Sequence, residues 1–509
     1  MRQSNNNKAY IFLFFIFLFH GLNNHYILTK SKFFFLINAD SGVYFNHIVY
    51  NFKMFKKHDF LFEQFYLYSF KPPLYFLTAI PFCLFGIKDA YFITLFPNMI
   101  YFSILLFSTY GIGNKLYNYK AGLLSAFLVS MFPTVFACSR ILMVDFALMA
   151  MVSLYFYLLV LNKFESFKFS LLTGIVMGLC FLAKPSFFIY MFICLGYFLI
   201  NKHNIKNKRK LRNFCFSIII GLIIAASYYK AQDNSRYAYH LLFVGHPEVS
   251  YYFYRIINCQ LLPVFFILFI LGSLYFYIRK DYFLPTLIIV FLILFSISPN
   301  KADRFILPVF PLISIIIGRY ICSFSHNVFR KTIIVFLIFY SLTQFLLISY
   351  ASEISDKYNF LYNKFKDISS LDAGLFSTVK CNPEFEVLKK ILKIIKKYKV
   401  KNIVITADAY FCNQLLIYYN AISDSCNVNI IDMPDPFFIR GKELETYSKR
   451  IENSDIIISA HDINKISSIQ EMSLFNRYMA MSLKNNVYKF DLLKDRPLPY
   501  YAYVKKSIK

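Results

Sequence analysis

Six charged residues stand out in the apolar first 350 residues of this sequence, because side chains of their types could do chemistry. A carboxylate can accept or orient a proton, and a lysine or arginine can stabilise negative charge. Charge near hydrocarbon is costly and is usually retained for function. The six residues are Asp40, Lys71, Arg140, Asp145, Lys301 and Arg304.

Each of these residues also has an ordinary explanation. A single acid such as Asp40 at a helix end is commonly just solvated, and Lys71 could extend its ammonium group from an apolar surface to water. Arg140 and Asp145 could form an ion pair, although their i,i+5 spacing is not a helical pairing spacing. Lys301 and Arg304 could anchor the chain at a membrane interface. The collection is therefore more informative than any one member.

The elements that must position these residues are membrane helices. Of the 509 residues, 58% are hydrophobic and 16% are charged, against the roughly 25% usual for soluble domains. Long apolar runs such as Val264–Tyr277 and Ile333–Tyr350 recur, which is typical of spanning helices. A net charge of +27 would suggest nucleic acid in a soluble protein, but cytoplasmic loops of membrane proteins also accumulate Lys and Arg. We therefore expect a lipid bilayer and no nucleic acid as partner.

Eleven apolar segments are expected to span the membrane. The first follows Arg2 and Lys8 as in a signal peptide, but no small-residue cleavage site follows it, so we expect an uncleaved helix. The fifth and sixth could instead form a re-entrant hairpin. The segments are 9–22, 90–111, 120–138, 146–162, 169–183, 186–201, 213–229, 259–278, 282–298, 305–322 and 332–350.

Charge fixes the expected sidedness of the loops. The segment Lys202–Arg212 carries six basic residues and no acid, so the positive-inside rule makes it cytoplasmic. Counting outward from it, and independently from a cytoplasmic N-terminus, gives the same map of a plasma (inner) membrane protein. Loops 112–119, 163–168, 279–281 and 323–331 fall inside, whereas loop 23–89, turn 139–145, loop 230–258, turn 299–304 and the C-terminal region fall outside.

One apolar run is too long for a single span, and another is too short. The run from Lys120 to Leu161 would be about 60 Å long as one helix, twice the ~30 Å hydrocarbon core, so it must turn between Arg140 and Asp145. The short apolar segment 74–86 is expected to lie as a helix at the outer interface, because a span there would reverse the map.

The composition changes beyond residue 351, which divides the chain into a membrane domain (1–351) and an extracytoplasmic domain (352–509). Alternating strands and helices suggest that the second domain is a small α/β domain. It contains no GxGxxG or Walker sequence, which favours a structural or acceptor-docking role. The expected elements are a helix at Glu384–Tyr398, a strand at Asn402–Thr406, a helix at Phe411–Tyr419, and strands at Val428–Met433 and Asp455–Ser459.

Cysteine and histidine usage leaves two questions open. The ten Cys residues are scattered without a CxxC pair, and Cys412 and Cys426 could form a disulfide in an oxidising compartment. A divalent metal could lie between acids and His47 or His246, but no ligand spacing supports one.

Six short motifs lie in order along the membrane domain. They are Asp40…Tyr44, Lys71-Pro-Pro-Leu, Gly113-Asn-Lys-Leu-Tyr-Asn followed by Ala121-Gly-Leu-Leu-Ser-Ala, Arg140…Asp145, Gly178-Leu-Cys-Phe-Leu-Ala-Lys184-Pro185 and Arg304-Phe-Ile-Leu-Pro308. Their order and sidedness together resemble those of the GT-C fold glycosyltransferases, in particular the group of aminoarabinose lipid A transferases and protein O-mannosyltransferases. One departure is that protein mannosyltransferases usually carry Asp-Glu where this chain has Asp40-Ser41.

The resemblance implies a polytopic α-helical membrane protein of GT-C type that moves a sugar from a polyprenyl-phosphate carrier to an envelope acceptor. Lipid A or lipopolysaccharide, another glycan or a protein all fit as acceptor. Asp40 and Asp145 would be the catalytic carboxylates. The donor phosphate would be bound by Lys71, Arg140, Lys301 and Arg304, and the substrate pocket would include Tyr44, Tyr75 and His246.

Two rival functions remain at this point. A flippase or transporter of lipid-linked sugars should show inverted repeats and polar residues in broken helices near mid-membrane. The sequence shows no internal repeat, and its notable charges lie at the expected outer ends. A sensor that binds an envelope ligand through its C-terminal domain would not need those charges.

Overall fold

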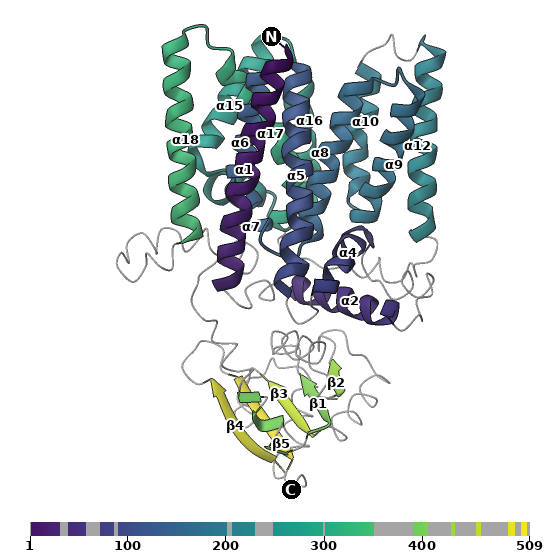
Figure 1. Ribbon diagram of the computed structural model, residues 1–509, viewed down its shortest axis with the longest axis vertical. Coiled ribbons are helices and arrows are strands. Elements are labelled where there is room, and N and C mark those ends of the chain that lie inside the picture. The colour runs from purple at the N-terminus through teal and green to yellow at the C-terminus, as the bar shows by residue number, and fades with distance from the viewer. Residues whose placement is uncertain are drawn as a thin grey trace. The chain divides into compact units, whose positions relative to one another are not determined.

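The computed structural model divides the chain into two compact units, residues 1–35 with 51–379 and residues 36–50 with 380–509 (Figure 1). The expected domain boundary at residue 351 lies outside the described residues and stays a prediction. The structure describes residues 2–30, 39–56, 72–85, 90–200, 206–229, 248–298, 301–350, 390–391, 393–395, 397–398, 400–405, 429–432, 455–459, 487–493 and 500–505.

Apolar helices build the first unit, because a helix satisfies its own backbone hydrogen bonds inside hydrocarbon (Figure 1). In chain order they are α1 (Arg2–Lys30), α4 (Leu74–Ala79), η2 (Ile80–Phe85), α5 (Ala90–Leu116), α6 (Tyr119–Met131), α7 (Pro133–Cys138), α8 (Val144–Asn162), α9 (Phe167–Ala183), α10 (Phe187–Ile200), α12 (Lys208–Tyr229), α14 (Tyr251–Arg255), η3 (Ile256–Gln260), α15 (Leu262–Ile278), α16 (Phe283–Ile297), η4 (Asp303–Val309), α17 (Phe310–Cys322) and α18 (Asn327–Ser349).

These helices make the chain a multi-pass membrane protein. Within the described residues, five helices are long and apolar enough to cross a bilayer, and a bent pair would make a sixth. Four shorter apolar helices accompany them. Helical residues occur in each of the eleven expected segments, but eleven as the number of crossings stays a prediction.

Three of the expected spans are broken by their sequences. The helix expected at 120–138 stops at Phe132, whose backbone is extended, because a proline disfavours the helical conformation of the residue before it; α7 then begins at Pro133. The span expected at 259–278 bends by 117° between η3 and α15. The segment before α17 is the 3-10 helix η4, which contains Pro308.

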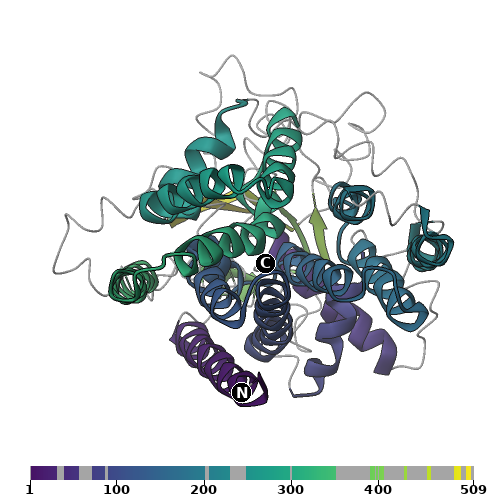
Figure 2. The same cartoon turned by 90° about the horizontal axis from the view of Figure 1, so that it is seen from above.

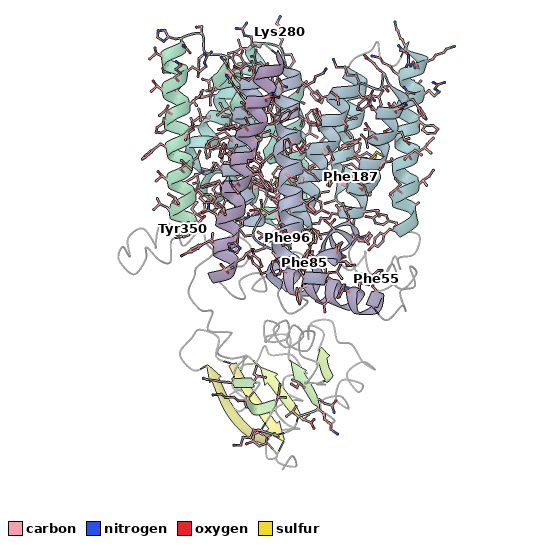
Figure 3. All side chains as sticks on the ribbon, viewed as in Figure 1. Phe55, Phe85, Phe96, Phe187, Lys280 and Tyr350 are labelled. Atoms are coloured by element: carbon pink, nitrogen blue, oxygen red, sulfur yellow. The ribbon has the colours of Figure 1, made fainter. Side chains whose placement is uncertain are left out.

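Two contacts each join connections that the charge count predicts to lie on the same side of the membrane. The Tyr117 hydroxyl donates a hydrogen bond to Asp281 over 3.3 Å, and both residues lie in connections expected on the inside. Asp145 and Arg304 lie 3.7 Å apart, and both are the last residues of turns expected on the outside. Lys280 and Tyr350 mark these opposite ends in Figure 3. Each of these two pairs thus lies at one end of the unit, whereas the full map and the side of the membrane stay predictions.

Small residues let the helices of this unit approach closely. A Cβ atom at Gly113 of α5 would lie 2.7 Å from the Cα of Gly122 in α6, so only hydrogen fits there. The Asn118 side chain caps α6 by accepting a hydrogen bond from the Ala121 amide over 2.9 Å. This part of the sequence resemblance is therefore explained by helix packing rather than by chemistry.

Helix α8 lies inside the first unit, because 83% of the residues in its most apolar stretch are buried. In helices α1 and α18 only 33% of the corresponding residues are buried, and both helices lie at the periphery, as the view from above shows (Figure 2). Since α8 begins with Val144 and Asp145, the buried helix carries a charged residue at its first turn.

The second unit contains a five-stranded sheet in the order β2-β1-β3-β5-β4. Strands β1 (Asn402–Ile405), β2 (Asn429–Asp432) and β3 (Ile456–Ser459) are parallel and match three expected strands. Strands β5 (Tyr500–Lys505) and β4 (Val487–Leu493) add an antiparallel edge that the sequence did not predict. The unit also contains part of α2 (Ala39–Lys56). The helix expected at Phe411–Tyr419 lies outside the described residues, so the α/β class of the domain stays a prediction.

Candidate active site

Asp145 is the centre of a charged cluster at the end of the helical unit that the charge count predicts to be the outer one. It occupies the first turn of α8, where the partial positive charge of a helix N-terminus favours a carboxylate. Its side chain is only 2% exposed. A carboxylate so far from water needs cations close by.

Lys184 supplies the first of these cations. Its ammonium nitrogen lies 2.5 Å from Oδ1 of Asp145, and its side chain is 18% exposed. Lys184 is the residue after α9, and its extended backbone follows from Pro185, which disfavours a helical residue before it. The end of α9 therefore places the ammonium group beside the start of α8.

Arg304 supplies the second cation. Its Nε lies 3.7 Å from Oδ2 of Asp145, and its side chain is 20% exposed. The ring of Phe305 lies under both cations, 4.4 Å from the Lys184 ammonium and 5.5 Å from the Arg304 guanidinium. The Tyr190 hydroxyl on α10 donates a hydrogen bond of 2.8 Å to the Phe305 carbonyl, which holds this part of η4 in place.

A hydrogen-bonded layer fixes the turn from which α8 starts. The side-chain amide of Asn98 donates to the carbonyls of Ser139 and Ile141, over 3.1 and 2.7 Å. Its oxygen accepts a hydrogen bond of 2.7 Å from the hydroxyl of Tyr75, which is fully buried. Tyr75, predicted to line the substrate pocket, thus supports the backbone that presents Asp145.

Arg140 points into the protein interior from the same turn. Its Nε donates to Asn24 over 3.1 Å and one terminal nitrogen donates to Ser349 over 2.7 Å. Its guanidinium lies over the rings of Phe136 and Phe345, at 5.0 and 5.1 Å. Arg140 is fully buried, so it connects α1, α7 and α18, and Asp145 pairs with Lys184 and Arg304 instead.

A second buried ion pair adjoins Arg304. Asp303 is completely buried, and Arg255 of α14 donates to its two carboxylate oxygens over 2.9 and 2.5 Å. The Gln260 side chain donates to the Asp303 carbonyl over 2.8 Å, and the Tyr251 hydroxyl donates to the carboxylate over 3.2 Å. These bonds connect the bent α14–η3 segment to the start of η4, which carries Arg304.

The other predicted site residues are distributed as follows. Lys301, two residues before Asp303 in the sequence, is buried, and Tyr44 is buried in α2. Asp40 is the second residue of α2, but its side chain lies outside the description, as do Lys71 and His246. Their roles stay predictions. In the described part of the chain, no three His, Cys, Asp or Glu side chains gather as metal ligands.

Sequence reasoning assigned no role to Lys184, Arg255 or Asp303. Lys184 was noted only as part of the motif Gly178–Pro185, although the predicted topology already indicated its position. The span before it runs outward in the predicted topology, so the residue that ends it shares the outer end with Asp145. Arg255 and Asp303 gave no such signal, because their pairing depends on the bend between η3 and α15.

The arrangement can bind an anion with several oxygen atoms. Asp145 is buried, whereas Lys184 and Arg304 keep about a fifth of their surface exposed and remain able to donate further hydrogen bonds. Donors on a lysine and an arginine held by one carboxylate are suited to phosphate oxygens. Such preorganised cations stabilise charge that develops when a phosphate leaves.

Comparisons with protein families agree with this chemistry. Residues 71–229 match the dolichyl-phosphate-mannose-protein mannosyltransferase family. Residues 242–383 match the Alg9-like mannosyltransferase family. No curated protein sequence matches the chain significantly.

Solved structures show the same fold at low sequence identity. Apo ArnT from Cupriavidus metallidurans is 11% identical, with a TM-score of 0.56 over 90% of this chain and 93% of that one. ArnT bound to undecaprenyl phosphate gives a TM-score of 0.54 at 11% identity, over 94% and 97% of the two chains. The apo oligosaccharyltransferase of Archaeoglobus fulgidus is 12% identical, with a TM-score of 0.54 over 97% of this chain and 74% of that one.

The two family matches cover different parts of the chain, yet both families transfer sugars. The structural matches extend over nearly the whole chain. Together with the multi-pass helical architecture, they identify the chain as a membrane glycosyltransferase of the GT-C fold.

Proposed function

We propose that the enzyme takes a sugar from a polyprenyl-phosphate carrier and transfers it to an envelope acceptor on the extracytoplasmic side of the plasma membrane. The observation that carries this proposal is the cluster in which buried Asp145 holds Lys184 and Arg304, each partly exposed. Neighbours of the same fold support it, since one is ArnT bound to undecaprenyl phosphate and another is an archaeal oligosaccharyltransferase bound to dolichol phosphate and an inhibitory peptide.

In this proposal the two cations bind the donor phosphate. Glycosyl transfer passes through an oxocarbenium-like state, and negative charge grows on the phosphate as its bond to the sugar breaks. Lys184 and Arg304 would stabilise that charge more strongly in the transition state than in the bound donor. Asp145 would orient both cations, because its buried carboxylate already contacts each of them.

A separate carboxylate has to act on the acceptor. A hydroxyl or amine acceptor loses a proton as it attacks the sugar carbon, and a carboxylate near it can take or orient that proton. Asp40 is our candidate on the grounds of its sequence context, and Lys71 and Lys301 remain candidates for additional phosphate contacts.

Charge removal at the two cations tests the donor site. Lys184→Met and Arg304→Gln should each lower the transfer rate as well as the affinity for the donor, because the lost interaction strengthens toward the transition state. Lys331→Gln, at an exposed position of α18, is the matched control. Normal transfer rates in both site variants would contradict the assignment. The flippase alternative is not favoured, because both family matches are to glycosyltransferases.

A further inference from the structure

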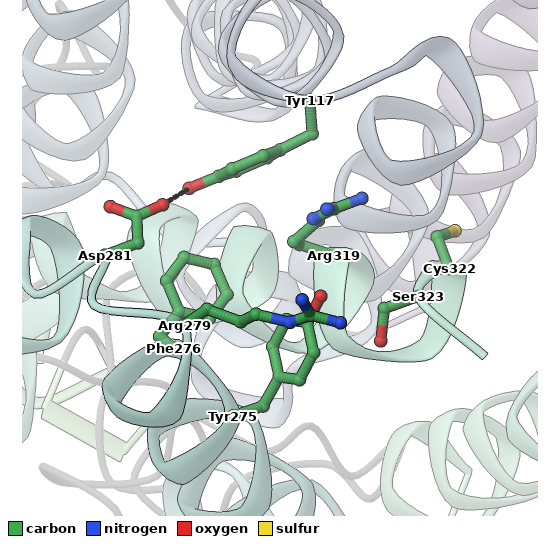
Figure 4. A pocket seen from close by; sticks show the side chains of 8 residues that line it. All are labelled: Tyr117, Tyr275, Phe276, Arg279, Asp281, Arg319, Cys322 and Ser323. Atoms are coloured by element: carbon green, nitrogen blue, oxygen red, sulfur yellow. Dashed lines mark hydrogen bonds between the residues drawn. The ribbon is translucent and has the colours of Figure 1, made fainter.

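A cavity of about 480 Å³ lies at the end of the helical unit opposite Asp145. It forms where the α5–α6 connection, the α15–α16 connection and the end of α17 meet (Figure 4). From Arg304 to Arg319 the chain runs 15 residues along η4 and α17, which corresponds to about 22 Å of helix. The cavity is therefore separate from the cluster around Asp145.

Two arginines give this cavity its charge. Arg279 follows the last turn of α15, and Arg319 lies in the last turn of α17. The structure shows them over aromatic rings, with Arg279 at 5.7 Å from the centre of Tyr275 and Arg319 at 5.2 Å from the centre of Tyr117. Neither arginine forms an ion pair with any of the described residues.

The carboxylate that lines the cavity is already engaged. Asp281 accepts a hydrogen bond from the Tyr117 hydroxyl over 3.3 Å (Figure 4). Burial and the neighbouring Asp281 raise the pKa of Tyr117, so the phenol keeps its proton and continues to donate to Asp281 at neutral pH. Asp281 is thus held by the tyrosine rather than by either arginine.

An ordinary explanation accounts for the presence of basic residues at this end but not for their arrangement. Helix C-termini favour cations, and inner connections accumulate them. Such a preference does not require two arginines to share a site, yet exposed Arg279 and half-buried Arg319 both line one cavity with aromatic walls. A cation–π contact is not a hydrogen bond to the ring, so it leaves the guanidinium N–H groups able to donate in the fork geometry that suits phosphate oxygens.

We propose that this cavity binds a phosphate group, either the headgroup phosphate of an anionic lipid or a free phosphate. The two arginines donate to the phosphate oxygens, and the rings of Tyr117 and Tyr275 contact the adjoining apolar part of the ligand. The cavity lies at helix ends, which is the depth of lipid headgroups. Its volume is within the range of small-ligand sites.

Binding measurements on the purified full-length protein test this proposal without relying on transferase activity. The protein is placed in nanodiscs of phosphatidylcholine with increasing phosphatidylglycerol, and bound lipid is counted by native mass spectrometry. Inorganic phosphate is then added at constant ionic strength. Wild-type protein should retain phosphatidylglycerol, and Arg279→Gln with Arg319→Gln should weaken retention by about tenfold for each arginine.

The matched control removes two charges elsewhere on the same expected side, by Arg209→Gln with Lys331→Gln at exposed positions. It should retain lipid like the wild type. Competition by inorganic phosphate would show that the free ion also occupies the site, and its absence would assign the site to a lipid headgroup. Equal retention by all three proteins, an equal loss in the control, or no binding of either probe would overturn the proposal. Should the double variant fail to fold, Arg279→Gln alone, at an exposed position, should still weaken phosphatidylglycerol retention by about tenfold.

Discussion

Lys184 and Asp145 are 39 residues apart in sequence, yet the lysine ammonium lies 2.5 Å from the aspartate carboxylate. The contact joins the end of one membrane helix to the start of another. Only the cation of the pair keeps appreciable exposure, at 18% against 2% for Asp145. This asymmetry makes the pair a means of presenting a positive charge to a ligand.

Asp145→Asn should reduce transfer mainly by releasing the two cations. We expect turnover to fall by about 10²-fold, and the double variant Asp145→Asn with Lys184→Met to be little worse than the more impaired single variant, because contacting residues that act together are not additive. A double-mutant cycle on transfer rate measures this. Additive losses would show that Asp145 acts independently of Lys184.

Arg140 should matter more for stability than for donor binding. Arg140→Ala leaves a cavity between Phe136 and Phe345 and should lower the free energy of unfolding by about 2–4 kcal/mol. Arg140→Met keeps most of the side-chain volume and should be milder. Thermal unfolding in detergent tests the difference. A loss of donor affinity in Arg140→Met as large as in Arg304→Gln would instead support the sequence-based prediction that Arg140 binds the donor phosphate.

The Arg255–Asp303 pair should respond unequally to removal of its partners. Arg255→Gln leaves a completely buried carboxylate without its cation and should cost about 3–5 kcal/mol of stability. Asp303→Asn leaves an arginine that is 14% exposed and can reach water, so the cost should be smaller. The double variant should be more stable than Arg255→Gln alone. Equal costs for the two single variants, measured by thermal unfolding, would contradict this account of the pair.

Asp40→Asn tests the proposed acceptor carboxylate. If Asp40 orients or deprotonates the acceptor, turnover should fall by about 10²-fold or more while the protein stays folded and binds donor normally. Steady-state transfer kinetics with a donor-binding assay separate these effects. Near-wild-type turnover would remove Asp40 from the mechanism.

Much of the helical unit could be predicted, because it depends on the lengths of apolar runs and on the number of spans between basic loops. Apolar length located the helices, and charge parity placed Asp145 and Arg304 at the same end. The direction of Arg140 could not be predicted in the same way. It depends on how the turn between α7 and α8 rotates its side chain toward Asn24 and Ser349, which hydropathy does not encode.

The missed features have equally specific causes. Phe132 and Pro133 lie within a continuous apolar run, so hydropathy favoured one helix where proline geometry gives two. Strands β4 and β5 mix charged and aromatic residues, and their pairing within the sheet is a long-range contact. In the sequence, Asp303 is an acid in a polar turn, and nothing there indicates a partner. Its pairing with Arg255 depends on the bend before α15.

The central claim is that sugar leaves a polyprenyl-phosphate donor only when an acceptor receives it. The direct measurement uses purified protein in nanodiscs with polyprenyl-phosphate-linked sugar, with and without a crude envelope acceptor. We predict that free polyprenyl phosphate accumulates only with the acceptor present, and that Lys184→Met and Arg304→Gln slow its release while Lys331→Gln does not. Movement of intact donor between the leaflets of a liposome, without loss of its sugar, would contradict the account and show that the protein is a flippase.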